Sequence, residues 1–357
     1  MTLHIFNPDH DLALASGLAN FTAPHAGRQL RHDLGWLPAL WAESDDAVMT
    51  DDVMQSQRAA RCRPVGTRLF TDKRQVATLP VTAIEPWGWN SALCSQLLRA
   101  GINSHLLPTD ETLQAIRMLS HRRQAALMLA RLQSAETTGE AVECTTIDDA
   151  IGQAHQYGRA VMKAPWSSSG RGIRFVDINN CDTFGSGLDG WIRNTISRQG
   201  SVMVEPFYHK IKDFGMEFLS DGHGNLQYQG LSLFHTQNGA YAGNIIATEE
   251  SKRQQLARYI PIDLLDHIRN KLCSELDMLL NGCYCGPLGV DMMIVGKEAA
   301  LSSCLLHPCV EINLRRTMGH VALAIGQKLN PPKDDDMRHV MRITFTGNNY
   351  KLQIKRL

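Results

Sequence analysis

Residues 309–316 read CVEINLRR, a stretch in which polar and charged side chains alternate with apolar ones. On a β-strand, side chains two positions apart point to the same face, so Glu311, Asn313 and Arg315 would share one face. Burying a carboxylate without a partner is costly, and the apolar neighbours of this one favour a functional site over a solvated strand face. Arg315 would present a planar guanidinium to an oxyanion or phosphate, whereas Arg316 should face the other way.

A second predicted strand, GPLGVDMMIV (286–295), could pair with the first and also carries a carboxylate between apolar residues. Pairing would gather Asp291, Glu311 and Asn313. Magnesium prefers hard oxygen ligands and is commonly held by a few carboxylates plus substrate phosphates. The two strands together therefore predict a magnesium site made of these three side chains.

The segment KAPWSSSGRGIRF (163–175) places Lys163 at the end of one predicted strand and a serine- and glycine-rich loop before the next. Glycine lets a backbone approach a phosphate, and serine hydroxyls and backbone N–H groups can donate to its oxygens. A Walker loop or a dinucleotide fingerprint needs a helix after the loop, and the chain contains neither motif. Taken alone, a solvated hairpin loop would explain the segment as well. The candidate phosphate-binding loop residues are Ser167, Ser168, Ser169, Gly170, Arg171 and Gly172.

The segment VMVEPFYHKIKDFGMEF (202–218) is an apolar strand that delivers Glu205 to an extended connector, with Asp213 eight residues later. The backbone of such a connector can hydrogen-bond an adenine edge, and a later carboxylate can bind ribose hydroxyls. The alternative is that Glu205 ends an edge strand and that Asp213 faces solvent.

The first hundred residues alternate predicted strands (3–7, 47–51 and 81–86) with helical patterns, the clearest at 90–102. This order predicts a parallel sheet in an α/β layer. Ligands of such sheets lie beyond the carboxyl ends of the strands, where NPDHD (7–11) and EPWGWN (85–90) fall. Turn chemistry and core packing would explain these motifs equally well. The candidate substrate residues there are Asp9, His10, Asp11, Trp87 and Trp89.

Further along the chain, the hydrophobic pattern predicts alternating helices and hairpins. The predicted helices cover 109–132, 145–158 and 261–280, and the predicted hairpins cover 214–234 and 342–357.

Composition and charge limit the class of protein. The 357 residues, 43% hydrophobic and 20% charged, predict a globular chain of two or three packed subdomains. Lys plus Arg equals Asp plus Glu at 36 each, which disfavours nucleic acid and anionic membranes as partners and leaves a homo-oligomer open. The N-terminus does not resemble a signal peptide, and nine cysteines, an odd number, favour reduced thiols and the cytoplasm.

A zinc site is a further candidate. Its ligands would be Cys283, Cys285, Cys304, His307 and Cys309, but their spacing matches no standard zinc motif.

The order of these features, from the lysine strand and glycine-rich hairpin to the E-x-N-x-R strand, resembles the ATP-grasp superfamily. The resemblance covers roughly residues 120–325. It implies a mixed α/β and α+β chain in which a Rossmann-like pre-ATP-grasp domain (1–115) precedes two ATP-grasp subdomains, one with the flap (116–200) and one with the adenine linker and metal site (201–357).

The resemblance also implies a role for each motif. Lys163 would bind the α- and β-phosphates of ATP beneath the loop at 167–172, and Glu205 with the backbone near Phe207 would hold adenine. Asp213 would hold ribose, an aspartate where glutamate is commoner. The family usually has a further phosphate lysine at the start of the preceding helix, where this chain offers Arg122 or Arg123. The implied Mg²⁺ ligands are Asp291, Glu311 and Asn313, with Arg315 stabilising the acyl phosphate or the tetrahedral intermediate.

The activity implied by the resemblance is an ATP- and magnesium-dependent ligase that activates a carboxylate as an acyl phosphate and joins it to an amine. Amino-acid or peptide-like small molecules would be the substrates. Two alternatives stay open, a small-molecule kinase of the same fold and a non-catalytic nucleotide-binding protein. Phosphate left on the product, rather than released, would identify the kinase.

Overall fold

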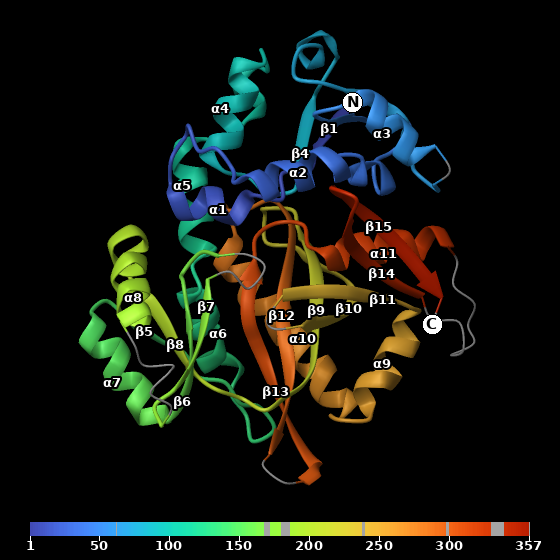
Figure 1. Cartoon of the computed structure of the whole chain (residues 1–357). Coiled ribbons are helices and arrows are strands. Elements are labelled where there is room, and N and C mark those ends of the chain that lie inside the picture. The colour runs from blue at the N-terminus through green and yellow to red at the C-terminus, as the bar shows by residue number, and fades with distance from the viewer. Residues whose placement is uncertain are drawn as a thin grey trace.

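Three β-sheets organise the computed structural model (Figure 1), which describes residues 1–61, 63–167, 172–179, 186–237, 240–297, 300–329 and 339–356. One sheet belongs to the N-terminal segment, the second lies in the middle of the chain, and the third and largest comes from the C-terminal half. The mixture of parallel and antiparallel sheets with helices confirms the predicted α/β and α+β fold class.

The N-terminal sheet is parallel, with strand order β3-β2-β1-β4. It confirms the three predicted strands and adds β3, whose three residues are too few to show a periodic pattern. Its strands are β1 (Thr2–Ile5), β2 (Ala47–Met49), β3 (Leu69–Thr71) and β4 (Ala83–Pro86). Its helices are α1 (His10–Ser16), α2 (His25–Leu34), α3 (Val53–Ala60) and α4 (Ser91–Arg99), with short 3-10 turns at Leu37–Leu40, Val76–Thr78 and Ser104–Leu106.

The helical pattern predicted over 109–132 forms two helices, α5 (Asp110–Leu119) and α6 (Arg123–Leu132), with a break between them. Local polar groups cap both sides of the break. The Ser120 hydroxyl donates to the Ile116 carbonyl (2.7 Å), and Nδ1 of His121 accepts from the Arg123 backbone N–H (3.0 Å). Such side-chain bonds compete with helix continuation, and the break places Arg122 at the start of α6.

The middle sheet is antiparallel, with order β5-β8-β6-β7. Its strands are β5 (Val142–Cys144), β6 (Arg159–Lys163), β7 (Ile173–Asp177) and β8 (Val202–Pro206), so β8, which begins the third predicted subdomain, pairs within this sheet. The predicted pairing of β6 with β7 is confirmed. Helices α7 (Ile147–Tyr157) and α8 (Ser186–Gln199) pack on the outer face (Figure 1), and the predicted cap of α7 is confirmed, since Thr146 Oγ1 accepts from the Asp149 N–H.

The large sheet has seven strands in the order β13-β12-β9-β10-β11-β14-β15. Both predicted hairpins are confirmed. The strands are β9 (Lys210–Ser220), β10 (Leu226–Gln237), β11 (Ala240–Ile246), β12 (Gly286–Lys297), β13 (Ala300–Asn313), β14 (His339–Thr346) and β15 (Asn349–Arg356). The helices are α9 (Glu249–Ala257), α10 (Ile262–Leu280), which confirms the prediction over 261–280, and α11 (Met318–Leu329).

Two elements of this half were not predicted. Helix α9 is strongly polar and shows no apolar stripe, so tertiary contacts such as buried Leu256 hold it in place. Strand β11 contains Gly243 and Asn244, residue types that are depleted in strands. Among the described residues, no helix is long and apolar enough to cross a membrane.

Candidate active site

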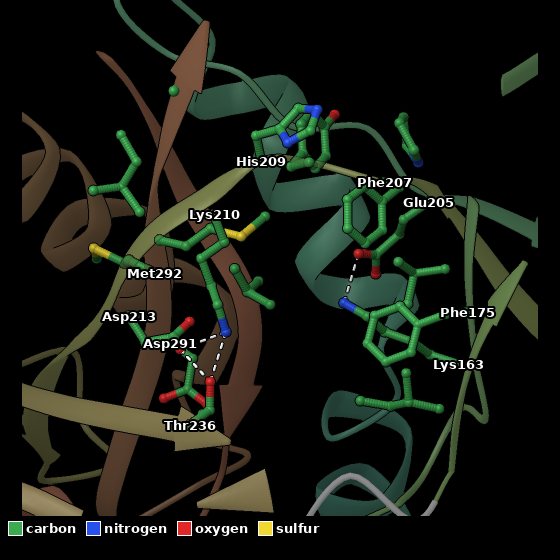
Figure 2. A pocket seen from close by; sticks show the side chains of 18 of the residues that line it. Lys163, Phe175, Glu205, Phe207, His209, Lys210, Asp213, Thr236, Asp291 and Met292 are labelled. Atoms are coloured by element: carbon green, nitrogen blue, oxygen red, sulfur yellow. Dashed lines mark hydrogen bonds and ion pairs between the residues drawn. The ribbon is translucent and has the colours of Figure 1, made fainter. Parts of the chain in front are cut away.

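A cavity of about 920 Å³ separates the middle sheet from the large sheet (Figure 2). Lys163, Phe175 and Glu205 lie on the wall formed by the middle sheet. Asp213, Thr236 and Asp291 lie on the wall formed by the large sheet. The volume suits a nucleotide-sized ligand, because small-molecule pockets commonly measure roughly 300–1,000 Å³. Two groups of residues predicted from separate motifs therefore line one space.

Lys163 and Glu205 form a buried ion pair, with Nζ 2.5 Å from Oε2. Glu205 lies opposite Val161 in the β6–β8 ladder. Val161 and Lys163 are two positions apart on β6, so their side chains point to the same face and Lys163 can reach Glu205. Each side chain thus has a buried partner of opposite charge at the cavity wall. A nucleotide phosphate approaching Lys163 would share it with this carboxylate.

We expect Lys163→Met to lower the free energy of unfolding by about 3–5 kcal/mol, because it leaves Glu205 as an uncompensated buried charge. Urea denaturation would measure the loss. The double variant Lys163→Met/Glu205→Leu removes both charges and should recover most of the stability. If the single and double variants are equally unstable, Lys163 does not contribute to stability through its ion pair with Glu205.

The connector after β8 differs from its predicted role in one respect. The Phe207 N–H donates to the Arg159 carbonyl (2.9 Å), so this N–H is not available to an adenine edge. The ring of Phe207 is held by the Arg159 guanidinium, 4.2 Å from the ring centroid, and by an edge contact with Phe175. Phe207 therefore contributes an aromatic wall to the cavity.

Asp213 lies across the cavity in a small polar cluster (Figure 2). Its Oδ2 accepts from Lys210 Nζ at 2.6 Å and from the Thr236 hydroxyl at 2.5 Å. Lys210 also donates to Thr236. The carboxylate thus faces the cavity with part of its hydrogen-bonding capacity used, and neither Lys210 nor Thr236 was predicted from the sequence.

The antiparallel register of β12 and β13 places Asp291 directly opposite Glu311, as the strand pattern predicts. The Asn313 amide donates to Asp291 Oδ2 at 3.2 Å. Desolvation, together with the nearby carboxylates of Glu311 and Glu217, raises the pKa of Asp291 to about 8. Repulsion among these carboxylates is the kind of strain that a bound cation would relieve.

Asp291 and Glu311 present carboxylate oxygens, the hard donors that magnesium prefers, whereas the Asn313 amide oxygen accepts from Arg315 Nη2 at 2.8 Å. In the described part of the chain, no group of three or more His, Cys, Asp or Glu side chains is arranged to hold a metal ion. A self-contained protein cage is therefore absent there, and the zinc alternative at Cys283, Cys285, Cys304, His307 and Cys309 finds no support.

Arg315 joins the N-terminal segment to β13 and its neighbour β12. Its guanidinium binds Asp11 in a bidentate manner, with Nε to Oδ1 at 2.9 Å and Nη2 to Oδ2 at 2.8 Å. Nη2 also donates to Asn313 Oδ1 at 2.8 Å. Burial opposes the charge of Arg315, but Asp11 and the neighbouring carboxylates raise its pKa overall. Arg316 faces the other way and pairs with Glu85 at 3.0 Å, as predicted.

Of the two candidate arginines at the start of α6, Arg122 points into the site. It donates to the Ala164 carbonyl (3.0 Å) and the Ser167 hydroxyl (3.2 Å), and it pairs with Glu311 (3.0 Å). Arg123 pairs with Glu143 instead. Arg122 thus ties the base of the glycine-rich loop to the metal strand.

The loop itself is only partly described. Ser168, Ser169, Gly170 and Arg171 lie outside the described residues. Ser167 is buried, and Gly172 approaches it so closely that a Cβ at Gly172 would lie 2.4 Å from the Ser167 Cβ. Glycine is therefore required at position 172 for steric reasons.

A second cavity, of about 280 Å³, adjoins the first, and both are lined by Phe234, Thr236 and Asp291. Asp11 and Trp87 reach this second cavity from the N-terminal segment. A smaller space therefore lies next to the nucleotide-sized one, beside Arg315.

The other candidate substrate residues do not line either of these two cavities. His10 is buried, with Nδ1 3.2 Å from the Asn90 amide, and desolvation lowers its pKa to about 4. Asp9 lies at the start of α1, and burial raises its pKa. Trp89 packs in the core and borders a separate pocket near Tyr284. Turn chemistry and packing, the alternative explanation, account for these three.

Besides Thr236, the sequence analysis missed four polar residues of the second cavity, which come from the middle strands of the large sheet. Glu217 lies between Met216 and Phe218, the same apolar flanking that identified Glu311, and this signal could have revealed it. Ser232, Tyr241 and Asn244 carry no comparable signal, because only the sheet brings them together.

Comparisons with known proteins bear on the fold. No protein-family model and no curated protein sequence matches the chain. A solved structure of the biotin carboxylase domain of Hydrogenobacter thermophilus 2-oxoglutarate carboxylase, with MgADP, ADP and bicarbonate, is similar over 96% of this chain and 74% of its own, at 11% identity and a TM-score of 0.56. N5-carboxyaminoimidazole synthetase from Staphylococcus aureus with ADP covers 97% and 83%, at 13% identity and a TM-score of 0.51. Biotin carboxylase from Campylobacter jejuni, in a β,γ-ATP complex, covers 96% and 75%, also at 13% and 0.51.

These neighbours are ATP-grasp proteins, and the chain has the ATP-grasp fold. The fold that the superfamily resemblance predicted is thus confirmed, with no particular member identified. At 11–13% identity the likeness establishes the fold alone.

Proposed function

We propose that this protein is an ATP- and Mg²⁺-dependent ligase that joins a carboxylate to an amine. One observation carries the proposal. Asp291, Glu311, Asn313 and Arg315 converge where the nucleotide-sized cavity meets the smaller one. The neighbours' complexes with ADP, MgADP and an ATP analogue support nucleotide and magnesium use. A binding protein without chemistry would have no need of a metal set beside a second ligand cavity.

The residues have separate tasks in the proposed reaction. Lys163, Arg122 and the described ends of the glycine-rich loop would neutralise the phosphates. Asp291, Glu311 and Asn313 would hold magnesium, which offsets the charge on the transferring phosphoryl group. Phe175 and Phe207 would flank the base, and Glu205 and Asp213 supply acceptors for adenine and ribose.

The chemistry would proceed in two balanced steps. A substrate carboxylate oxygen attacks the γ-phosphorus of ATP, and the bond between that phosphorus and the β-phosphate oxygen breaks. ADP departs, and the substrate becomes an acyl phosphate. The amine then attacks the acyl carbon, phosphate departs with its bonding electrons, and the nitrogen loses a proton. Arg315 lies where it could stabilise the negative charge on the acyl phosphate or the tetrahedral intermediate.

Magnesium binding should depend on pH through Asp291. The folded-state pKa of Asp291, about 8, lies above the unfolded value. Protonation of Asp291 therefore stabilises the metal-free fold, fully below about pH 4, and this contribution to stability is lost as the pH rises toward 8. Magnesium must displace the proton. We therefore expect Mg-ATP to raise the melting temperature more at pH 8 than at pH 6. Asp291→Asn should remove that difference, and a pH dependence that survives in this variant would contradict the assignment.

The test is release of ADP and free phosphate by the purified protein with Mg-ATP and pooled amino acids and small carboxylates. Release that requires both the pool and magnesium would support the ligase. ADP formation with phosphate retained on a product would indicate the kinase. No turnover together with no rise of melting temperature in Mg-ATP would overturn the nucleotide proposal, whereas a rise without turnover would indicate a nucleotide-binding protein.

A further inference from the structure

Glu217 is a buried carboxylate at the wall of the second cavity. Among the described residues, no lysine or arginine forms an ion pair with it. Its side chain is 3% exposed, and Oε2 accepts no hydrogen bond. Among the residues that the structure describes, the charged or titratable group within ion-pair distance is His320, with Nδ1 3.0 Å from Oε2. Isolated buried carboxylates are costly, so this arrangement calls for an explanation.

His320 is poorly placed to supply the missing charge. Its Nε2 lies 3.3 Å from the Phe218 carbonyl, an acceptor, and must carry a proton to bond it. Its Nδ1 accepts the Thr317 backbone N–H at 3.1 Å. The Thr317 N–H therefore already occupies the side of the His320 ring that lies 3.0 Å from Glu217 Oε2. The glutamate therefore lacks a donor on that side.

The fold keeps space clear around this carboxylate. Gly289 lies opposite Glu217 on β12, and a Cβ at Gly289 would lie 2.6 Å from Oε2. A Cβ at Gly319, in the first turn of α11, would lie 1.8 Å from Oε1. Two glycines from separate elements thus make room for one side chain. The site is built to hold a carboxylate in this position.

The other carboxylates of the cavity already have donors. Asp11 is bound by Arg315, Glu311 by Arg122, and Asp291 by the Asn313 amide. Glu217 contributes no third acidic ligand to a metal site among the described residues. Its position at the wall of the 280 Å³ cavity leaves a substrate as the source of positive charge.

We propose that Glu217 anchors the amine of the second substrate in this cavity as an ammonium ion, and that the nitrogen passes one proton to this carboxylate before its lone pair attacks the acyl carbon. The inference rests on the proposed ligase function and names one substrate of that site: a small molecule with a primary ammonium group. Ser232 and Asn244, linked by a 2.8 Å hydrogen bond, line the polar side. Phe6, Trp87 and Met318 line the opposite, apolar side. The ligand would therefore carry an apolar portion beside its ammonium group.

The first test needs no ligand. If Glu217 awaits a cation, Glu217→Gln should leave the melting temperature of the unliganded protein unchanged or raise it by roughly 2 °C, because it removes an unpaired buried charge. If Glu217 instead forms a structural ion pair with His320, the same change should lower the melting temperature by several degrees. That result would overturn the proposal.

The second test measures melting temperature in Mg-ADP with the twenty common amino acids, ethanolamine and putrescine, each beside its N-acetyl derivative. We expect a free amine, but not its acetylated form, to stabilise the wild-type protein, and Glu217→Gln to lose at least tenfold in affinity for it. Glu275→Gln, a change on α10 far from the cavity where Glu275 pairs with Arg131, should bind like the wild type. No amine-specific shift, or one that Glu217→Gln retains, would overturn the anchor.

The two proposals fail differently in this design. Stabilisation by Mg-ADP or Mg-ATP alone does not involve Glu217. If it persists while the amine effect is absent, the anchor is wrong and nucleotide binding stands. If it is absent as well, the proposed function fails too.

Discussion

Glu311→Gln is expected to lower the rate of ADP formation by about 10³-fold, equivalent to roughly 4 kcal/mol of transition-state stabilisation. Glu311 lies opposite Asp291 across the β12–β13 ladder and supplies charge that glutamine lacks. It also neutralises Arg122 at 3.0 Å, the arginine that holds Ser167 at the base of the loop. The substitution should therefore weaken both the metal and the phosphate grip. The coupled release of ADP and phosphate measures the effect.

A matched control is available on the neighbouring arginine. Glu143 pairs with Arg123 at 3.0 Å, much as Glu311 pairs with Arg122, but outside the cavity. Glu143→Gln should keep wild-type turnover and a similar melting temperature, because ion pairs that reach solvent contribute little and this one is only partly buried. Comparable activity of Glu311→Gln and Glu143→Gln would remove Glu311 from the metal site.

Arg315→Ala should lower kcat by about 10²–10³-fold, the effect of losing one preorganised donor to a developing oxyanion. Binding of Mg-ATP should change little, because Arg315 lines the smaller cavity rather than the nucleotide-sized one. Single-turnover kinetics would separate the chemical step from nucleotide binding. The distinguishing result is a loss in kcat with the Kd for Mg-ATP preserved.

Stability complicates this variant, because Asp11 would lose its bidentate partner inside the protein. The double variant Asp11→Asn/Arg315→Ala removes the stranded charge and should fold better while remaining inactive. Arg316→Ala is the positional control, since Arg316 pairs with Glu85 and lies over the Trp41 ring. Activity recovered in the double variant would show that Arg315 serves the fold and not the reaction.

Asp11 illustrates what the sequence could and could not predict. Its place after β1 indicated a ligand-facing end of a parallel sheet, and the structure does bring it to the second cavity. Nothing local indicated that its partner would be Arg315, which lies 304 positions away. The same motif includes Asp9 and His10, which the fold directs elsewhere. Adjacent residues on the first turn of a helix point in different directions, and only the packed neighbours decide which of them meets a ligand.

The sequence by itself determined the β-strands that carry Lys163, Glu205, Asp291 and Glu311, because alternation along a strand is a local property with a period of two residues. It also determined the order of motifs that identifies the fold. Tertiary structure alone decided that Arg122 rather than Arg123 enters the site, and that Glu217 is buried with His320, rather than a lysine or arginine, within ion-pair distance. These outcomes depend on contacts between residues far apart in the chain, and the pattern along a single segment carries no information about such partners.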